Sequence, residues 1–92
     1  MIARRVVVRG RVQGVGFRYA ALEVAEAAGV TGWVRNCRDG TVEALVQGDA
    51  TSVEAVVAWC RRGPPAARVT DVEVVDAPLD ARLTGFDLHA TR

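Results

Sequence analysis

The segment with the most chemical potential is GRVQGVGFRY, residues 10–19. Gly14 and Gly16 directly precede Phe17, where a helical pattern begins, and Arg18 falls in the first turn of that helix. Glycines let backbone N–H groups converge, and a helix start adds unpaired donors and a positive dipole end. A guanidinium beside them can grip a phosphate through two parallel hydrogen bonds. The spacing therefore predicts an anion-binding loop, although a Gly-X-Gly turn is also compatible with a simple tight corner. The position of Arg18 favours the anion-binding interpretation, because a cation at a helix N-terminus is unfavourable unless an anion balances it.

Other catalytic patterns are absent from the chain. Ser52 is the only serine and lies in a helix-capping segment, and His89 is the only histidine, so a Ser-His-Asp triad is not indicated. The chain has no lysine for a Walker loop, and no third glycine follows Gly16 at Rossmann spacing. Cys37 and Cys60 lack metal-ligand spacing, and no pair of carboxylates stands out. We therefore expect no metal site and no cofactor.

The composition predicts one globular domain spanning residues 1–92. Half of the residues are hydrophobic, a quarter are charged, and the net charge is only +1. That balance argues against dedicated binding to nucleic acid or to a membrane surface. No apolar run approaches the ~18 residues of a membrane span, and no signal peptide precedes the first alternating stretch. We therefore expect a cytoplasmic protein, and in that setting a disulfide between Cys37 and Cys60 is not expected.

The hydrophobic periodicity predicts seven elements. Period-two alternation indicates strands, a 3.6-residue stripe indicates helices, and Asp-Gly at residues 39–40 is a hairpin signal. The second helix is predicted to open with a capping box from Thr51 to Glu54. The predicted elements are a strand over 4–12, a helix from Phe17 to a C-cap at Gly29, strands over 30–36 and 42–47, a helix from Thr51 to Gly63, a strand over 69–74 and a short strand over 86–90.

The order β-α-β-β-α-β-β predicts an α+β fold, a two-layer ferredoxin-like sandwich. In it, two amphipathic helices cover one face of an antiparallel-type sheet. The uncovered face is expected to be solvated and ion-paired, without a function of its own. Its charged residues would be Arg5, Arg9, Arg11, Glu43, Asp71, Glu73 and Asp87.

Two segments resemble the signatures of a known family. GRVQGVGFRY at 10–19 resembles the signature loop of the acylphosphatases, and GWVRN at 32–36 followed by DGTVE at 39–43 resembles their second signature. Their spacing, the element order and the length also match, so the resemblance covers essentially the whole chain. It implies a ferredoxin-like sandwich that hydrolyses the carboxyl–phosphate bond of acyl phosphates without metal or cofactor. The small molecules involved would be an acyl phosphate and, as product, inorganic phosphate.

The resemblance also implies roles for individual residues. Arg18 would bind the phosphate, and Asn36 would orient the attacking water. The phosphate-binding loop would comprise Gln13, Gly14, Val15, Gly16 and Phe17, together with Arg18.

The chemistry of the reaction agrees with these roles. The leaving carboxylate has a pKa of about 4, so it departs at neutral pH without a general acid. What remains is to stabilise the phosphoryl charge and to place a water in line with the bond that breaks. Asn36, the only asparagine, can hold that water because its amide both donates and accepts hydrogen bonds. The alternative role for Asn36 is that of a turn residue that satisfies local backbone groups.

Two other functions share this predicted fold. An RNA-recognition sheet needs stacking aromatic residues on its central strands, and neither the first nor the third strand has one. A non-catalytic or regulatory acylphosphatase-like domain, as in carbamoyl-transfer maturation factors, would be part of a longer chain. Because this chain runs from Met1 to Arg92, we expect a free-standing enzyme. We also expect a monomer, although no sequence feature decides the oligomeric state.

Overall fold

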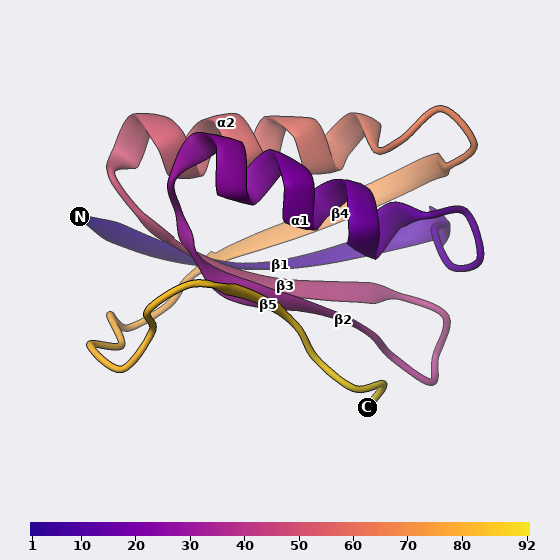
Figure 1. Cartoon of the computed structure of the whole chain (residues 1–92). Helices are drawn as coiled ribbons and strands as arrows, with labels where there is room; N and C mark the ends of the chain where they lie inside the picture. Colours follow the sequence, from indigo (N-terminus) through magenta and orange to yellow (C-terminus); the bar gives the residue numbers. More distant parts are fainter.

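The computed structural model describes all residues from 1 to 92. Two helices form one layer and a five-stranded sheet forms the other (Figure 1). The elements are β1 (Ile2–Arg11), α1 (Phe17–Ala28), β2 (Thr31–Asn36), β3 (Val42–Gly48), α2 (Ala50–Arg62), β4 (Arg68–Asp76) and β5 (Phe86–Leu88). This order and layering confirm the predicted ferredoxin-like α+β sandwich.

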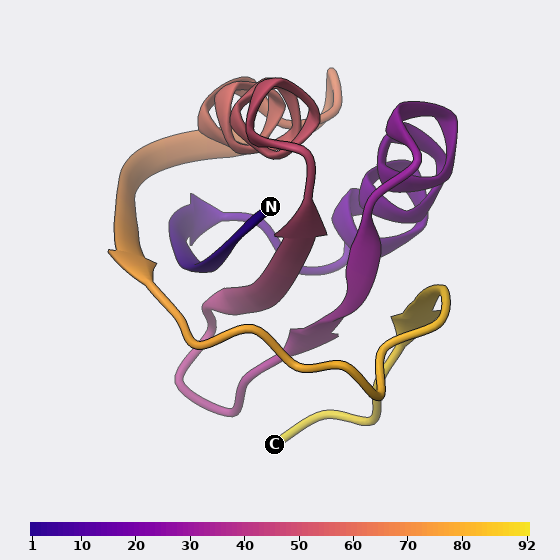
Figure 2. The same ribbon diagram turned by 90° about the vertical axis from the view of Figure 1, so that its left-hand side faces the viewer.

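The strands lie in the order β4-β1-β3-β2-β5. The pairs β1–β3, β1–β4 and β2–β3 are antiparallel, whereas β2 and β5 are parallel. After β4 the chain crosses beneath the sheet and enters β5 at the opposite edge (Figure 2). The sheet is therefore mixed: its four longer strands pair antiparallel, as predicted, and β5, whose pairing the sequence leaves open, runs parallel to β2.

The core lies between the helices and the sheet. It consists of sixteen buried hydrophobic residues. From β1, Val6 and Val8 point into it, as the period-two alternation predicts. The helix α2 buries Val53, Val56, Val57 and Cys60, and α1 buries Phe17, Ala21 and Ala25. No helix is long and apolar enough to cross a membrane.

Most element ends differ from the prediction by one or two residues, and two of these differences change how a helix or strand ends. The predicted capping box is wrong, because α2 begins at Ala50 with Asp49 as its N-cap and no side-chain cap hydrogen bond. The N–H of Val53 already donates to the carbonyl of Asp49 at 2.9 Å, which places Thr51 inside the first turn. The last strand stops at Leu88 instead of reaching residue 90. Gly29 is the C-cap of α1 with φ 75°, as predicted.

The turn between β2 and β3 is held by local hydrogen bonds. The backbone N–H and the hydroxyl of Thr41 both donate to Asp39 Oδ1, at 3.0 and 2.7 Å. These bonds hold the pKa of the Asp39 carboxyl below its ordinary value. Gly40 adopts φ 92°, as the Asp-Gly signal predicts. The turn follows Asn36, the last residue of β2, and so fixes the place of that side chain.

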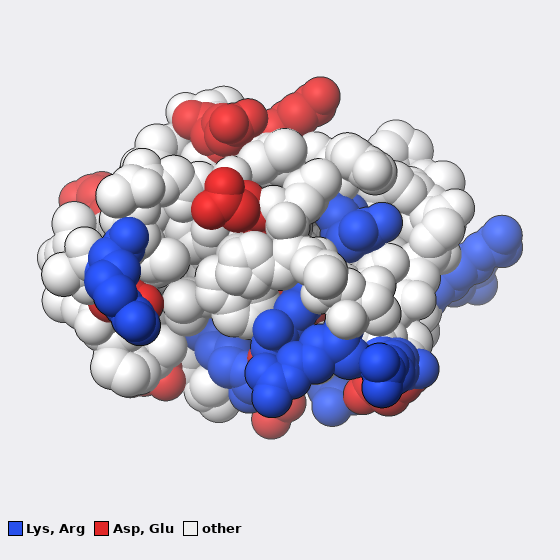
Figure 3. All heavy atoms as spheres, turned by 60° about the horizontal axis from the view of Figure 1, so that its bottom comes forward, with Lys and Arg blue, Asp and Glu red and all other residues white.

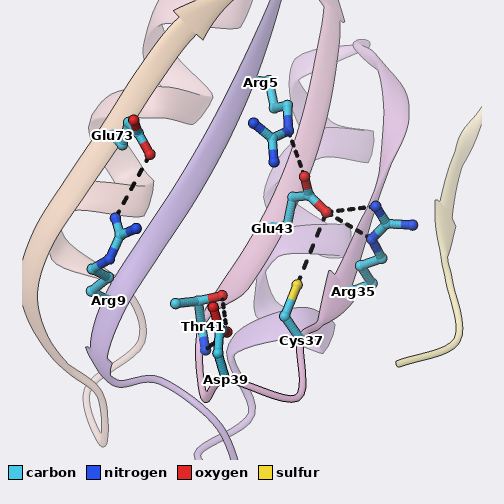
Figure 4. A network of polar contacts seen from close by, with 8 residues as sticks. All are labelled: Arg5, Arg9, Arg35, Cys37, Asp39, Thr41, Glu43 and Glu73. Atoms are coloured by element: carbon cyan, nitrogen blue, oxygen red, sulfur yellow. Dashed lines mark hydrogen bonds and ion pairs between the residues drawn. The ribbon is translucent and has the colours of Figure 1, made fainter. Parts of the chain in front are cut away.

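Arginine side chains gather on the face of the sheet away from the helices, with acidic groups among them (Figure 3). Glu43 is an exception to the predicted solvated face, because it is only 5% exposed. Its carboxylate accepts hydrogen bonds from Arg5 Nε at 2.5 Å and from Arg35 Nε at 2.8 Å (Figure 4). Burial raises the pKa of Glu43, but the hydrogen bonds from Arg35 and Arg5 outweigh it and leave the pKa below its ordinary value.

Candidate active site

The loop between β1 and α1 presents free backbone donors. Gly14 and Gly16 have φ angles of 73° and 80°, in the left-handed region that favours glycine, as the sequence predicts. Gly16 is the N-cap of α1, so no side chain caps the helix, and no acidic residue lies in its first turn. The first N–H groups of a helix have no partner inside it. They are therefore available, with the positive end of the helix dipole, to an anion at this point.

A cavity of about 130 Å³ opens at this helix start and reaches the end of β2. Five of the residues singled out from the sequence line it: Gly14, Gly16, Phe17, Arg18 and Asn36. Sequence reasoning missed two other lining residues, Val12 and Tyr19. Tyr19 could have been found as the neighbour of Arg18 on the exposed side of the helix, where it is 61% exposed.

Two residues of the predicted loop do not line the cavity. Val15 packs against the hydrophobic core, and the side chain of Gln13 hydrogen-bonds to the turn between β2 and β3. Some residues of the predicted loop therefore line the cavity, whereas Val15 and Gln13 contact the neighbouring core and turn.

A larger groove, of about 550 Å³, lies between α1 and the C-terminal end of α2. It is lined by Ala20, Trp59, Pro64 and their neighbours, and Gly14, Gly16, Phe17 and Arg18 are not among its lining residues. It does not include the helix start, so it lacks the converging N–H donors that an anion needs. The smaller cavity is the better candidate for phosphate chemistry.

Arg18 is a cation without a carboxylate partner. It takes part in none of the ion pairs of the molecule and in none of its side-chain hydrogen bonds. Its guanidinium lies 5.6 Å from the centre of the Tyr19 ring, and the side chain is half-buried at the cavity. Arg18 can therefore offer its full set of N–H donors to an anion in the cavity.

Asn36 brings a buried acceptor to the same cavity. Its Oδ1 atom is buried and has no hydrogen-bond partner in the chain. Leaving such an atom without a partner costs about 1–3 kcal/mol, so a buried oxygen without a protein partner points to a bound water or ligand or to a catalytic role. The side chain makes none of the local backbone hydrogen bonds expected of a turn asparagine. In the backbone, Asn36 pairs with Val42 of β3, and its carbonyl accepts a hydrogen bond from the N–H of Arg92, in the C-terminal tail, at 3.0 Å.

No titratable side chain other than Arg18 and Tyr19 lines the cavity. The chain has no group of three or more His, Cys, Asp and Glu residues that could hold a metal ion. His89 lies away from the cavity and stacks on Trp33, with ring centres 5.1 Å apart. The residues at hand can thus bind an anion and orient a neutral molecule, but they offer no acid–base pair near neutral pH.

The sequence model of the family described as Acylphosphatase matches residues 4–88. An acylphosphatase of Methylococcus capsulatus is 53% identical over 81 residues, which are 88% of this chain and 88% of that one. An acylphosphatase of Azoarcus sp. is 52% identical over 92 residues, which are 99% of this chain and 92% of that one. The chain therefore belongs to the acylphosphatase family, enzymes that hydrolyse acyl phosphates.

A solved structure agrees with this assignment. The crystal structure of an acylphosphatase from Bacillus subtilis is similar to this chain with a TM-score of 0.92 and 36% identity. The match covers 97% of this chain and 99% of that one, so the two chains share the fold over nearly their whole matched length.

Proposed function

We propose that the chain hydrolyses the carboxyl–phosphate bond of an acyl phosphate at the cavity between the β1–α1 loop and Asn36. One observation carries this proposal: Asn36, whose buried Oδ1 has no hydrogen-bond partner in the chain, lines the same cavity of about 130 Å³ as the unpaired Arg18 and the free start of α1. One cavity is thus lined by a residue with an unpaired cation and by a residue with an unpaired acceptor. A phosphoryl group and a water molecule satisfy both.

In this proposal the phosphoryl group lies at the start of α1. The backbone N–H groups that follow Gly14 and Gly16 donate to its oxygens, and Arg18 donates through two parallel bonds. The transferring group carries negative charge on three oxygens, which these donors stabilise without rearranging. The loop glycines matter because a φ near 75° turns the backbone N–H groups toward one point.

Asn36 holds the nucleophile. Oδ1 accepts a hydrogen bond from a water, which leaves a lone pair of that water aimed at phosphorus on the side opposite the acyl oxygen. The new bond joins the water oxygen to phosphorus, and the bond from phosphorus to the acyl oxygen breaks with its electron pair going to the carboxylate. The water proton goes to a phosphate oxygen, so the products are a carboxylate and inorganic phosphate.

The proposed reaction runs without a metal, a cofactor or a partner chain. The carboxylate leaves without taking up a proton, so the reaction requires no general acid and no general base from the protein. The donors that stabilise the transition state in this proposal are Arg18 and the backbone N–H groups at the start of α1. We propose that this domain acts as one unit.

Release of inorganic phosphate from acetyl phosphate and benzoyl phosphate tests the proposal. Both should be hydrolysed, whereas an ordinary alkyl phosphate monoester should not, because its alkoxide leaving group requires a proton that the site does not supply. Asn36→Ala should lower kcat strongly and change the inhibition constant of inorganic phosphate little. Equal turnover of the monoester, or loss of phosphate affinity with kcat retained, would refute the assigned roles.

A further inference from the structure

The side chain of Gln13 spans two parts of the chain that are far apart in sequence. Its Nε2 donates to the backbone carbonyl of Cys37 at 2.7 Å and to that of Thr41 at 2.9 Å. The first acceptor lies 24 residues away and the second 28. An amide nitrogen carries two hydrogens, so one side chain saturates its donor capacity on this single turn.

The two carbonyls bracket the turn that follows Asn36. The N–H of Cys37 donates to the carbonyl of Thr41 at 2.9 Å, which closes the turn at its base. The hydrogen bonds of Asp39 and Thr41 hold its tip. The turn is therefore held rigidly by its own hydrogen bonds. A side chain that binds the base of the turn also sets the position of Asn36, the residue immediately before Cys37.

Gln13 also stands next to Gly14 at the start of the β1–α1 loop. The same residue thus joins the loop that offers N–H donors to the strand end that carries the water-holding amide. The strands β1 and β2 do not pair directly, since β3 lies between them in the sheet, so the side chain of Gln13 adds a direct link from the loop to the turn. The distance between the phosphoryl group and the water depends on such a link.

We infer that Gln13 is a positioning residue: it holds the β2–β3 turn against the β1–α1 loop, so that Asn36 Oδ1 faces the bound phosphoryl group. This inference rests on the proposed function and assigns to Gln13 a role different from phosphate binding. Its side chain does not line the cavity, and its donors are already engaged. A reacting atom displaced by about 1 Å can cost on the order of 100-fold in rate.

The chain offers a matched control. Gln47, the only other glutamine, also joins distant backbone, donating to the carbonyl of Asp80 at 3.0 Å and accepting from the N–H of Asp80 at 2.8 Å. It lies away from the cavity. Gln47→Ala removes two hydrogen bonds, as Gln13→Ala does, and therefore corrects for a general loss of structure.

The test measures kcat with acetyl phosphate and the inhibition constant of inorganic phosphate for Gln13→Ala, Gln13→Glu, Gln47→Ala, Asn36→Ala and the double variant Gln13→Ala with Asn36→Ala. Gln13→Glu keeps the shape but cannot donate to two carbonyls. We expect kcat to fall roughly 10- to 100-fold in both Gln13 variants, with phosphate inhibition changed less than about twofold and Gln47→Ala near wild type. In the Asn36→Ala background, Gln13→Ala should lower kcat no further, because the group it positions is gone.

A second readout does not depend on turnover. Asn36, Gln13 and Gln47 carry the only side-chain amide groups in the chain, so three pairs of NH2 signals are expected in a nitrogen-15 correlation spectrum. Gln13→Ala should shift the Asn36 pair and leave the Gln47 pair in place, and Gln47→Ala should do the reverse.

Three results would overturn the inference. An unmoved Asn36 signal would show that Gln13 does not set its position, even in a protein without turnover. Additive losses in the double variant would mean that Gln13 acts independently of Asn36, and a parallel loss of phosphate affinity would make it a phosphate ligand. The proposed function fails separately, if the wild-type protein does not hydrolyse acetyl phosphate.

Discussion

Whether the wild-type protein or the Arg18→Ala variant is the more stable should depend on whether phosphate is present. Without phosphate, Arg18 is a cation at the N-terminus of α1, with no acidic residue in the first turn and no ion-pair partner. Removing it relieves an unfavourable interaction of about 0.3–1 kcal/mol and gains about 0.2 kcal/mol in helix propensity. The loss of the contact between the Arg18 guanidinium and the Tyr19 ring costs about 0.5 kcal/mol and so offsets part of this gain. Arg18→Ala should therefore be as stable as the wild type, or slightly more stable.

With phosphate the order should reverse. One charge pair at 4 Å is worth about 4 kcal/mol at an effective dielectric constant of 20, and Arg18 is the only cation lining the cavity. At a phosphate concentration 100 times its dissociation constant, the wild type gains about 2.7 kcal/mol. A variant that binds a few hundred-fold more weakly gains less than about 0.5 kcal/mol. For a domain of this size, the wild-type gain is worth roughly 10 °C or more in Tm.

Thermal unfolding with and without phosphate, together with turnover of acetyl phosphate, checks this prediction. Arg18→Ala should lose about 3–4 kcal/mol of transition-state stabilisation, or a few hundred-fold in kcat/KM. Arg18→Lys is the matched control: it keeps the charge at the helix start but not the paired donors, so its turnover should also be poor. The reasoning is refuted if Arg18→Ala is destabilised by more than about 1 kcal/mol in phosphate-free buffer. It is equally refuted if the variant retains the phosphate-dependent rise in Tm.

Three further outcomes follow from other parts of the molecule. Glu43→Gln should cost about 1–3 kcal/mol of unfolding free energy at pH 7. Because folding lowers the pKa of Glu43, the stability that this carboxylate contributes is present above its ordinary pKa of 4.5 and is lost as the pH falls through the lowered pKa. The free energy of unfolding of Glu43→Gln in urea should therefore depend less on pH in this range than that of the wild type. A thiol reagent at pH 8 should label the half-exposed Cys37 but not Cys60, whose pKa burial raises to about 12, and denaturation should reveal the second thiol. Finally, kcat should stay within about twofold between pH 5.5 and 8 after allowance for substrate ionisation, unaffected by EDTA or by His89→Gln; a bell-shaped profile would reveal an acid–base pair.

Local patterns predict the fold well, and they also locate the loop and the strand end that line the candidate site. Alternation over β1 identifies the residues that face the core, and glycines at 14 and 16 identify the loop, because both signals depend only on neighbouring residues. The end of β2 follows from the Asp-Gly turn, which places Asn36 correctly. The unpaired state of Asn36 Oδ1 is different, since it depends on everything that surrounds the side chain.

Contacts between distant residues are what the sequence does not show. Gln13 looks like part of the loop, but its acceptors lie 24 and 28 residues away in the chain. Glu43 alternates like a solvated strand residue, yet arginines from the strands on both sides cover it. The parallel pairing of β5 with β2 likewise depends on a crossover whose path no local periodicity encodes. Each miss concerns pairing across the sheet or across the site, and each needs the tertiary structure.

Hydrolysis of acetyl phosphate in water enriched in oxygen-18 tests the central claim most directly. The proposed site holds the phosphoryl group at the start of α1 and aims the water of Asn36 at phosphorus. With enough enzyme to make the uncatalysed reaction negligible, one labelled oxygen should appear in inorganic phosphate and none in acetate. Label in acetate would show attack on the carbonyl carbon, and would contradict both the role of the loop and that of Asn36.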